Sequence, residues 1–161
     1  MNKILIIDRD SSTLNDISRL TTALKFEPIV AFNSSSVVGI IRDEIAGIFI
    51  DVESKIISAE DIIKYFNGPQ KITNNNVIPV FLMYSNDESA HVEHAKKLLH
   101  TEMIKKPFTL ESIFNILYQH LNLNEFQYEQ FSNRYKLEQL KSYSVSLSGW
   151  LEKLGSLLEH N

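Results

Sequence analysis

The first 121 residues alternate between short, continuously apolar runs and segments whose apolar residues recur at helical spacing. Runs that are apolar at successive positions are typical of strands covered on both faces, as in parallel sheets. Three strong runs occupy residues 4–7, 47–50 and 77–83. Two weaker runs occupy residues 28–32 and 103–105. We therefore expect five strands, each of the first four leading into a helix and the fifth into a last one.

The segments between the runs carry apolar residues three or four positions apart, as on one face of a helix. These segments are centred on residues 14–24, 37–41, 62–66, 92–99 and 110–117. Ser11 or Ser12 is a candidate N-cap of the first helix, and Thr109, after Pro107, of the last. Strict alternation of strand and helix predicts right-handed crossovers, and hence an α/β fold with a doubly wound parallel sheet and helices on both faces.

Composition adds the class of protein. The chain has 161 residues, of which 43% are hydrophobic and 22% charged, and this suits one domain with an appendage. It has no cysteine, so disulfides and thiolate metal sites are excluded. No apolar run approaches the ~20 residues of a membrane span, and the first residues do not resemble a signal peptide. A formal net charge of −4 gives no overall attraction to nucleic acid. We expect a cytoplasmic protein that binds neither membranes nor nucleic acid.

Polar residues follow four of the five runs, where doubly wound sheets bind their ligands. Asp8 follows the first run, Asp51 the third, Tyr84 and Ser85 the fourth, and Lys106 the fifth. Carboxylates clustered at a sheet edge repel one another unless a cation joins them, and magnesium is the usual cation. A carboxylate beside a bound metal can attack a phosphoryl group, while a lysine and a small hydroxyl bind the phosphoryl oxygens. Because Asp51 closes a central strand, it is the better nucleophile candidate, and Asp8 is the better metal ligand.

These residues resemble the receiver domains of response regulators, which accept the phosphoryl group in two-component signalling. The matching motifs are ILIID ending at Asp8, FIDV containing Asp51, the Ile78-Pro79 pair that leads into the fourth run, and Lys-Pro-Phe-Thr at 106–109. The resemblance covers residues 1–121. It implies a flavodoxin-like sheet with the strand order 2-1-3-4-5.

The resemblance also implies a chemical role for each matched residue. Asp51 would accept a phosphoryl group from a histidine kinase or phosphotransfer protein, and Lys106 would bind that group. Magnesium would be held by Asp8, Asp51 and the backbone carbonyl of Glu53. A conformational change would then carry the signal, either through the helices at 92–99 and 110–117 or through the rest of the chain. No turnover is expected beyond phosphorylation and dephosphorylation of the receiver aspartate.

Arg9 departs from the family pattern, which usually has a second acid at this position. The change shifts the local charge by two units, and one charge pair at 4 Å is worth ~4 kcal/mol at an effective dielectric near 20. A guanidinium that points inward would oppose magnesium and pair with Asp8 or Asp51. One that points to solvent would leave those acids to hold a weakened magnesium site. The sequence leaves both orientations open.

Further departures concern the family's switch residues. Tyr84, followed by Ser85, stands where Ser or Thr usually ends the fourth strand, and Met103 replaces an aromatic residue. The Tyr84 hydroxyl is poorly placed to reach a phosphoryl oxygen, and we expect Ser85 to face the site only if the strand register slips by one. Lys55 and Ala59 occupy a loop that normally carries Pro and Gly.

These departures favour an alternative function, namely a pseudo-receiver that acts as a protein–protein interaction module without being phosphorylated. A flavin carrier of similar fold is a third hypothesis. It is disfavoured because no glycine-rich or Ser/Thr-rich phosphate loop follows the first strand, and the run Asp8-Arg9-Asp10 would repel an anionic cofactor.

Residues 122–161 form a C-terminal extension with two predicted helices, at about 124–141 and 144–159. Apolar residues recur along the second helix at Leu147, Trp150, Leu151, Leu154, Leu157 and Leu158. Alternating polar and apolar residues leave a strand open at 142–148. The extension would pack on the receiver domain, form a helical hairpin that binds a partner, or be the truncated linker to an output domain. We favour self-association, through this extension or through the face formed by the helices at 92–99 and 110–117.

Overall fold

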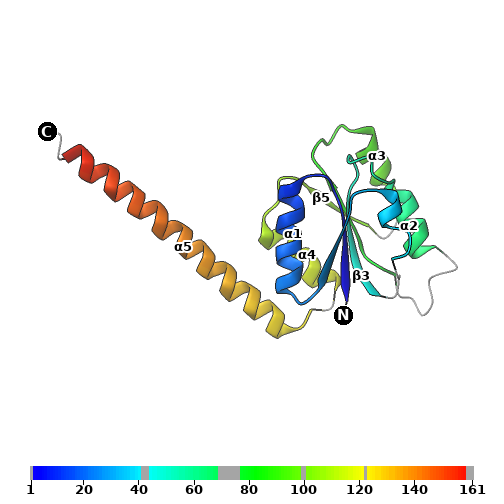
Figure 1. Cartoon of the computed structure of the whole chain (residues 1–161), viewed down its shortest axis with the longest axis horizontal. Helices are drawn as coiled ribbons and strands as arrows, with labels where there is room; N and C mark the ends of the chain where they lie inside the picture. Colours follow the sequence, from blue (N-terminus) through cyan, green and yellow to red (C-terminus); the bar gives the residue numbers. More distant parts are fainter. Residues whose placement is uncertain (1, 41–43, 69–76, 99–100, 122, 159–161) are drawn as a thin grey trace. The chain divides into compact units, whose positions relative to one another are not determined.

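The computed structural model describes residues 2–40, 44–68, 77–98, 101–121 and 123–158. Five parallel strands form one sheet in the order β2-β1-β3-β4-β5, which confirms the predicted topology. The strands are β1 (Lys3–Ile7), β2 (Glu27–Ala31), β3 (Ile45–Asp51), β4 (Val80–Tyr84) and β5 (Thr101–Lys105). The helices are α1 (Ser11–Ala23), α2 (Ala59–Asn67), α3 (Ala90–Ala95), α4 (Leu110–His120) and α5 (Glu125–Leu158), with a 3-10 turn η1 (Ser34–Ser36). Figure 1 shows α1 and α4 on one face of the sheet, and α2 and α3 on the other.

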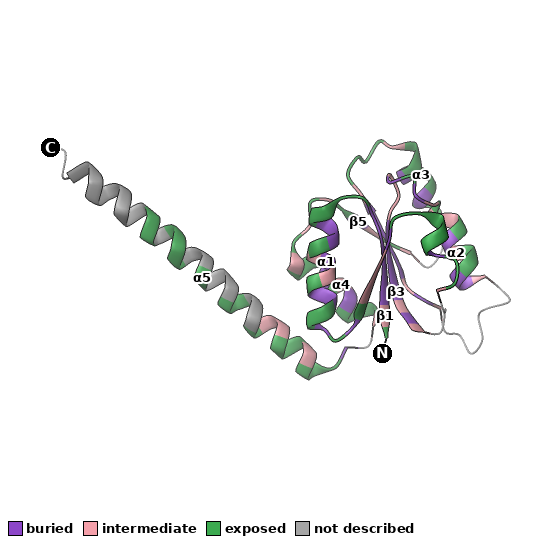
Figure 2. Cartoon of the chain, in the orientation of Figure 1, coloured by how far each residue is buried: buried purple, intermediate pink, exposed green. Residues whose placement is uncertain are grey.

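Burial explains why the strong apolar runs were recognisable. Every residue of Ile4–Ile7 and of Ile48–Ile50 has no exposed surface, because β1 and β3 lie inside the sheet and are covered on both faces. Figure 2 shows burial concentrated in these central strands. β2 and β5 are the edge strands and are only partly buried. Their apolar runs are correspondingly weaker.

The prediction of a helix around residues 37–41 was wrong for residues 37–40, the part of this segment that the structure describes. Ser34–Ser36 form a single 3-10 turn, which is capped by the side chain of Asn33. Serine side chains compete with the backbone for hydrogen bonds, and Gly39 adopts a φ of +97°, which no right-handed helix contains. Residues 41–43, including Ile41 of the predicted stripe, lie outside the described residues.

The N-cap of α1 is Asp10, so the prediction of Ser11 or Ser12 was wrong. The Asp10 carboxylate accepts hydrogen bonds from the backbone N–H groups of Ser12 (3.2 Å) and Thr13 (3.1 Å), and from the Thr13 hydroxyl (2.7 Å). These bonds, led by the one from the Thr13 hydroxyl, lower the pKa of Asp10. A carboxylate is the stronger acceptor at the positive end of a helix, and the earlier residue therefore becomes the cap.

The predicted start of the last helix in this domain is confirmed. The Thr109 hydroxyl accepts a hydrogen bond from the N–H of Ser112 (3.1 Å), and the N–H of Thr109 donates to the Ser112 hydroxyl (3.2 Å). This reciprocal capping box begins α4 only a few residues after Lys106. It thereby restrains the segment that carries this lysine at the end of β5.

The chain divides into two compact units, Met1–Asn122 and Leu123–Asn161. The second unit contains α5, a single helix of 34 residues, so the predictions of two helices and of an alternative strand at 142–148 were wrong. No proline interrupts residues 125–158, and the polar alternation at 142–148 is too weak a signal to break a helix by itself. A lone helix has no core of its own. Among the described residues, no helix has the length and apolar character needed to cross a membrane.

Candidate functional site

The residues predicted to meet lie at the carboxyl end of the sheet. Ile7 of β1 pairs with Ile50 of β3. Asp8 follows Ile7 and Asp51 follows Ile50, so these two residues are neighbours. Paired residues of parallel strands point to the same face of the sheet. The sheet register therefore brings together two carboxylates that are 43 positions apart in the sequence.

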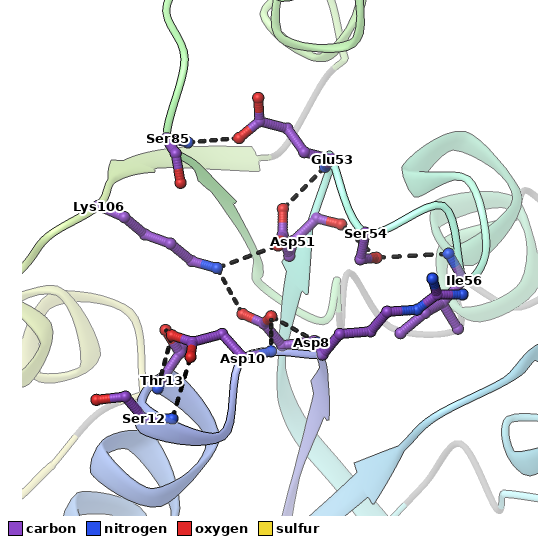
Figure 3. Close-up of polar contacts among 11 residues, drawn as sticks. Asp8, Asp10, Ser12, Thr13, Asp51, Glu53, Ser54, Ile56, Ser85 and Lys106 are labelled. Carbon is purple, nitrogen blue, oxygen red and sulfur yellow. Dashed lines mark hydrogen bonds and ion pairs between the residues drawn. The ribbon is translucent and has the colours of Figure 1, made fainter.

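Lys106 joins these two carboxylates, as Figure 3 shows. Its Nζ lies 2.7 Å from Asp8 Oδ2 and 3.1 Å from Asp51 Oδ2. All three side chains are largely buried, with exposed fractions of 1% for Asp8, 14% for Asp51 and 12% for Lys106. One ammonium thus serves two buried carboxylates, and the cluster keeps an excess of negative charge that attracts a further cation.

The two carboxylates are not equally satisfied. Asp8 Oδ1 accepts hydrogen bonds from the backbone N–H groups of Arg9 (2.6 Å) and Asp10 (2.9 Å), in addition to the Lys106 contact on Oδ2. Asp51 Oδ1 accepts one from the N–H of Glu53 (2.8 Å). A carboxylate can accept about four hydrogen bonds. Asp51 therefore retains the greater capacity for a metal ion or a phosphoryl group.

Electrostatics points the same way. Burial raises the pKa of Asp51 above its ordinary value, because the loss of hydration outweighs the hydrogen bond from Glu53 and the charge of Lys106. Burial acts to lower the pKa of Lys106, but the hydrogen bond to Asp8 and the attraction of Asp51 outweigh it, and the pKa is raised. The charged form of Lys106 is stabilised by two anions. Asp51 shares this one cation with Asp8, and the negative charge of Asp8 repels it. The carboxylate of Asp51 is the less compensated charge.

Replacing Asp51 with asparagine is expected to stabilise the fold at neutral pH. Because the pKa of Asp51 is raised on folding, the folded protein binds this proton more tightly than the unfolded chain. The contribution to stability is complete below the ordinary Asp value of 3.8 and is lost as pH rises through the raised pKa. Thermal unfolding should therefore give Asp51→Asn the higher melting temperature at neutral pH, with the difference shrinking on acidification. Equal melting temperatures at neutral pH would contradict this.

Arg9 is exposed, and none of the ion pairs between described residues includes it. Its contribution to the cluster is the backbone N–H that binds Asp8. The two acids take Lys106 as their cation instead. Of the two orientations left open by the sequence, the structure has the one in which Arg9 stays outside the pair.

Ser85 and Tyr84 lie on opposite faces of the sheet. Met83 pairs with Asp51, so Ser85, two positions further on, shares the Asp51 face without any slip in register. Ser85 lines a cavity of about 340 Å³ together with Lys106 and residues at the start of α1. The Tyr84 hydroxyl instead interacts with Asp87, whose pKa is lowered by Lys105 first and also by this hydroxyl. The prediction that Ser85 needs a slipped register was wrong.

Met103 belongs to the same face as Tyr84. It pairs with Leu82 of β4 and packs against the core cluster around Ile50 and Phe66. Both positions that differ from the family's switch residues therefore lie on the face opposite to Asp51. Met103 is itself partly buried and packs against the edge of this core cluster, to which α2 contributes Ile62 and Phe66.

The turn after β3 is closely hydrogen-bonded and directs Glu53 across the site. The N–H and hydroxyl of Ser54 donate to the carbonyl of Asp51 (3.2 and 2.8 Å), and Lys55 adopts a φ of +54°, in the region that favours glycine. Glu53 Oε2 accepts a hydrogen bond from the N–H of Ser85 at 2.6 Å. Sequence reasoning assigned Glu53 only a backbone carbonyl. No sequence signal identifies the side-chain contact, because it depends on how β3 and β4 are aligned.

The donor atoms suit a hard divalent cation. Magnesium prefers oxygen ligands and is usually held by one or two carboxylates, with carbonyl and water oxygens completing the shell. Asp8, Asp51 and the carbonyl of Glu53 offer this type of donor set. The described residues contain no group of three or more His, Asp or Glu side chains arranged for a metal ion. Two carboxylates and a backbone carbonyl are nevertheless a donor set of the kind that magnesium accepts when water completes its shell.

Comparison with known proteins supports the fold. No family model and no curated protein matches the sequence, whereas 120 chains of solved structures match. A response regulator receiver domain protein from Clostridium thermocellum has 23% identity and a TM-score of 0.58, over 76% of this chain and 95% of that one. The chemotaxis protein CheY4 of Vibrio cholerae has 17% identity and a TM-score of 0.60, over 75% and 99%.

A third similar structure is the receiver domain of the sensor histidine kinase PA1611 from Pseudomonas aeruginosa. It has 15% identity and a TM-score of 0.58, over 75% of this chain and 98% of that one, and it is described with a magnesium ion coordinated in its active-site cleft. The sheet order, the polar cluster at the strand ends and these similarities agree. The N-terminal unit of this chain has the fold of a response-regulator receiver domain.

Proposed function

We propose that this chain is a phosphoryl-accepting receiver of a two-component system, with Asp51 as the acceptor. The observation that carries the proposal is the position of Lys106, whose ammonium contacts both Asp8 and Asp51. A buried cation beside a nucleophilic carboxylate neutralises the charge that a phosphoryl group brings. An Asp51 oxygen would bond to phosphorus as the bond from phosphorus to the donor's histidine nitrogen breaks. The electron pair of that bond stays on the nitrogen.

The neighbouring residues have complementary roles in this proposal. The Ser85 hydroxyl, on the same face as Asp51, would donate a hydrogen bond to a phosphoryl oxygen. Asp8, Asp51 and the carbonyl of Glu53 would hold magnesium, which when bound neutralises the phosphoryl oxygens. Arg9 is exposed, so its charge would weaken magnesium binding through solvent without blocking the site.

The test is the intact mass of the protein after incubation with acetyl phosphate and magnesium. We expect one phosphoryl adduct on the native chain, none on Asp51→Asn, and an adduct on the control Asp10→Asn, since asparagine also serves as an N-cap. The absence of an adduct on the native chain at saturating magnesium would reject phosphorylation. The interaction module that works without phosphorylation would then be the better hypothesis.

The same measurement tests the effect of Arg9 on magnesium. Arg9→Asp would restore an acid beside Asp8 and is expected to reduce the magnesium concentration that gives half the adduct yield by about 10-fold. Arg9→Gln, which removes the positive charge without adding an acid, should give an intermediate value. Identical magnesium dependence in all three proteins would show that Arg9 does not weaken the site.

We also propose that α5 associates with α5 of a second copy of the chain. The sequence carries apolar residues at alternating spacings of three and four, the repeat of a coiled coil, at Leu140, Tyr143, Leu147, Trp150, Leu154 and Leu157. A single helix gains most of its stability from packing its apolar stripe against another element. A second copy supplies the same stripe.

Light scattering on the eluting full-length protein tests this association. We expect a dimer for the native chain, a monomer for the double variant Leu147→Ser/Leu154→Ser, and a dimer for the control Val145→Ser. Val145 is 72% exposed and lies outside the repeat. A native monomer would reject association, and a dimer that survives the double variant would reject the α5 repeat as the interface and favour one that includes α3 or α4.

A further inference from the structure

We infer that the Glu53 carboxylate competes with the phosphoryl group for one hydrogen-bond donor, the backbone N–H of Ser85. Glu53 accepts this hydrogen bond in the unmodified protein, and phosphorylation of Asp51 displaces its carboxylate. This inference rests on the proposed function of Asp51 and adds a specific residue that regulates it. The side chain of Glu53 thereby acts as a latch between the loop after β3 and the end of β4.

The register of the sheet creates this contact. Asp51 pairs with Met83, and the N–H of Val52 donates to the carbonyl of Met83 at 3.0 Å, so the ladder continues past the end of β3. Glu53 lies in the turn after β3 and Ser85 just past the end of β4, each two positions beyond the Asp51–Met83 pair. Their hydrogen bond, from the Ser85 N–H to Glu53 Oε2, measures 2.6 Å. Hydrogen bonds to a carboxylate are among the stronger ones in proteins.

Glu53 is also in direct contact with the acceptor carboxylate. Its N–H donates to Asp51 Oδ1 at 2.8 Å, while its side chain turns to Ser85, as Figure 3 shows. Ser85 lines the cavity that contains Lys106, whose ammonium contacts Asp51. A carboxylate oxygen of the protein therefore already accepts the hydrogen bond that the N–H of Ser85, a residue lining this cavity, would donate to another anion.

Charge decides which anion accepts the hydrogen bond from the Ser85 N–H once Asp51 is phosphorylated. A phosphoryl group adds negative charge next to Asp51, two residues from Glu53, and carries more acceptor oxygens than a carboxylate. The two anions repel each other, and Glu53 has solvent available because it is only partly buried. Glu53 therefore leaves Ser85, and a phosphoryl oxygen accepts the freed N–H. The loop between β3 and α2 is released from β4 by the same event.

Three substitutions at Glu53 separate the effect of side-chain length from the effect of charge. Glu53→Ala removes the carboxylate, Glu53→Asp keeps the charge but shortens the side chain by one methylene, and Glu53→Gln keeps the length but removes the charge. All three retain the backbone carbonyl proposed as a metal ligand. Glu102→Gln is the matched control, because Glu102 is an exposed acid near the start of β5, at the opposite end of the sheet.

The first measurement is amide hydrogen exchange at Ser85 in the full chain, without a phosphoryl donor. Loss of a charged hydrogen bond is expected to speed exchange at Ser85 by about 10-fold in Glu53→Ala and Glu53→Asp. Glu53→Gln should lie between these variants and the native chain, and Glu102→Gln should match the native chain. Equal exchange at Ser85 in native and Glu53→Ala protein would overturn the latch, whatever happens on phosphorylation.

The second measurement is the rate of adduct formation with acetyl phosphate and magnesium. Glu53→Ala and Glu53→Asp should both form the adduct faster than the native chain. If only the charge of Glu53 mattered, Glu53→Asp would form the adduct at the native rate, and this result would overturn the latch. Faster exchange with unchanged adduct rates would overturn the competition. No adduct on any of the proteins would reject the proposed function and the competition with it, while the exchange result would still report on the hydrogen bond.

Discussion

Replacing Lys106 with methionine is expected to lower the free energy of unfolding by about 3–5 kcal/mol at neutral pH, because removing one partner of a buried ion pair leaves the other uncompensated. Two carboxylates lose their shared cation here, and the side chain of Asp8 has only 1% of its surface exposed. Methionine retains much of the apolar volume of lysine, so the loss reports charge more than packing. Guanidinium unfolding followed by circular dichroism measures it.

The neighbouring lysine supplies the control for this experiment. Lys105 pairs with Asp87 on the exposed side of β5, and exposed pairs contribute little, so Lys105→Met should leave the unfolding midpoint nearly unchanged. Acid should partly rescue Lys106→Met, because a carboxyl of raised pKa binds its proton more tightly in the folded state, and stability then rises as pH falls. A loss that is equally small for both lysines would show that the buried cluster is compensated by other groups.

Replacing Asn67 with alanine is expected to destabilise the fold by about 2–4 kcal/mol, since it strips two buried backbone groups of their partners. Asn67 ends α2 and is 9% exposed. Its amide donates to the carbonyl of Ile78 (2.8 Å), and its carbonyl oxygen accepts from the N–H of Ile78 (2.9 Å). This paired contact ties α2 to the segment that enters β4.

The matched control is Asn33→Ala, which removes an asparagine that caps an exposed 3-10 turn. Its cost should be well below that of Asn67→Ala, because water replaces the lost hydrogen bond at an exposed position. Asn67→Asp keeps the acceptor but sets a carboxylate oxygen against the carbonyl of Ile78, and at neutral pH it should cost at least as much as Asn67→Ala. Equal unfolding midpoints for Asn67→Ala and Asn33→Ala would contradict a structural role for Asn67.

The departures from the receiver pattern are less disruptive in three dimensions than in the sequence. Arg9 lies outside the ion-pair cluster, and Ser85 shares the face of Asp51, whereas Tyr84 lies on the other face. The residues proposed to support phosphorylation are thus arranged together. Glu53 is the residue inferred to oppose phosphorylation, and measurements on its variants separate a slow receiver from an inactive one.

The sequence by itself determined the sheet and the position of its polar cluster. Strands buried on both faces must be apolar at successive positions, and this leaves a direct signature in runs such as 4–7 and 47–50. In a doubly wound sheet, the residues after such runs converge at one edge. Asp8, Asp51 and Lys106 were therefore predictable from local patterns alone.

Only the tertiary structure decided which side chains face one another within the cluster. The faces of Tyr84 and Ser85 follow from the pairing of Asp51 with Met83, which links positions 32 residues apart and has no local signature. The contacts of Glu53 with Ser85 and of Asn67 with Ile78 have the same origin. Side-chain direction in a sheet depends on register, and register is set by packing across the whole domain rather than by neighbours in the chain.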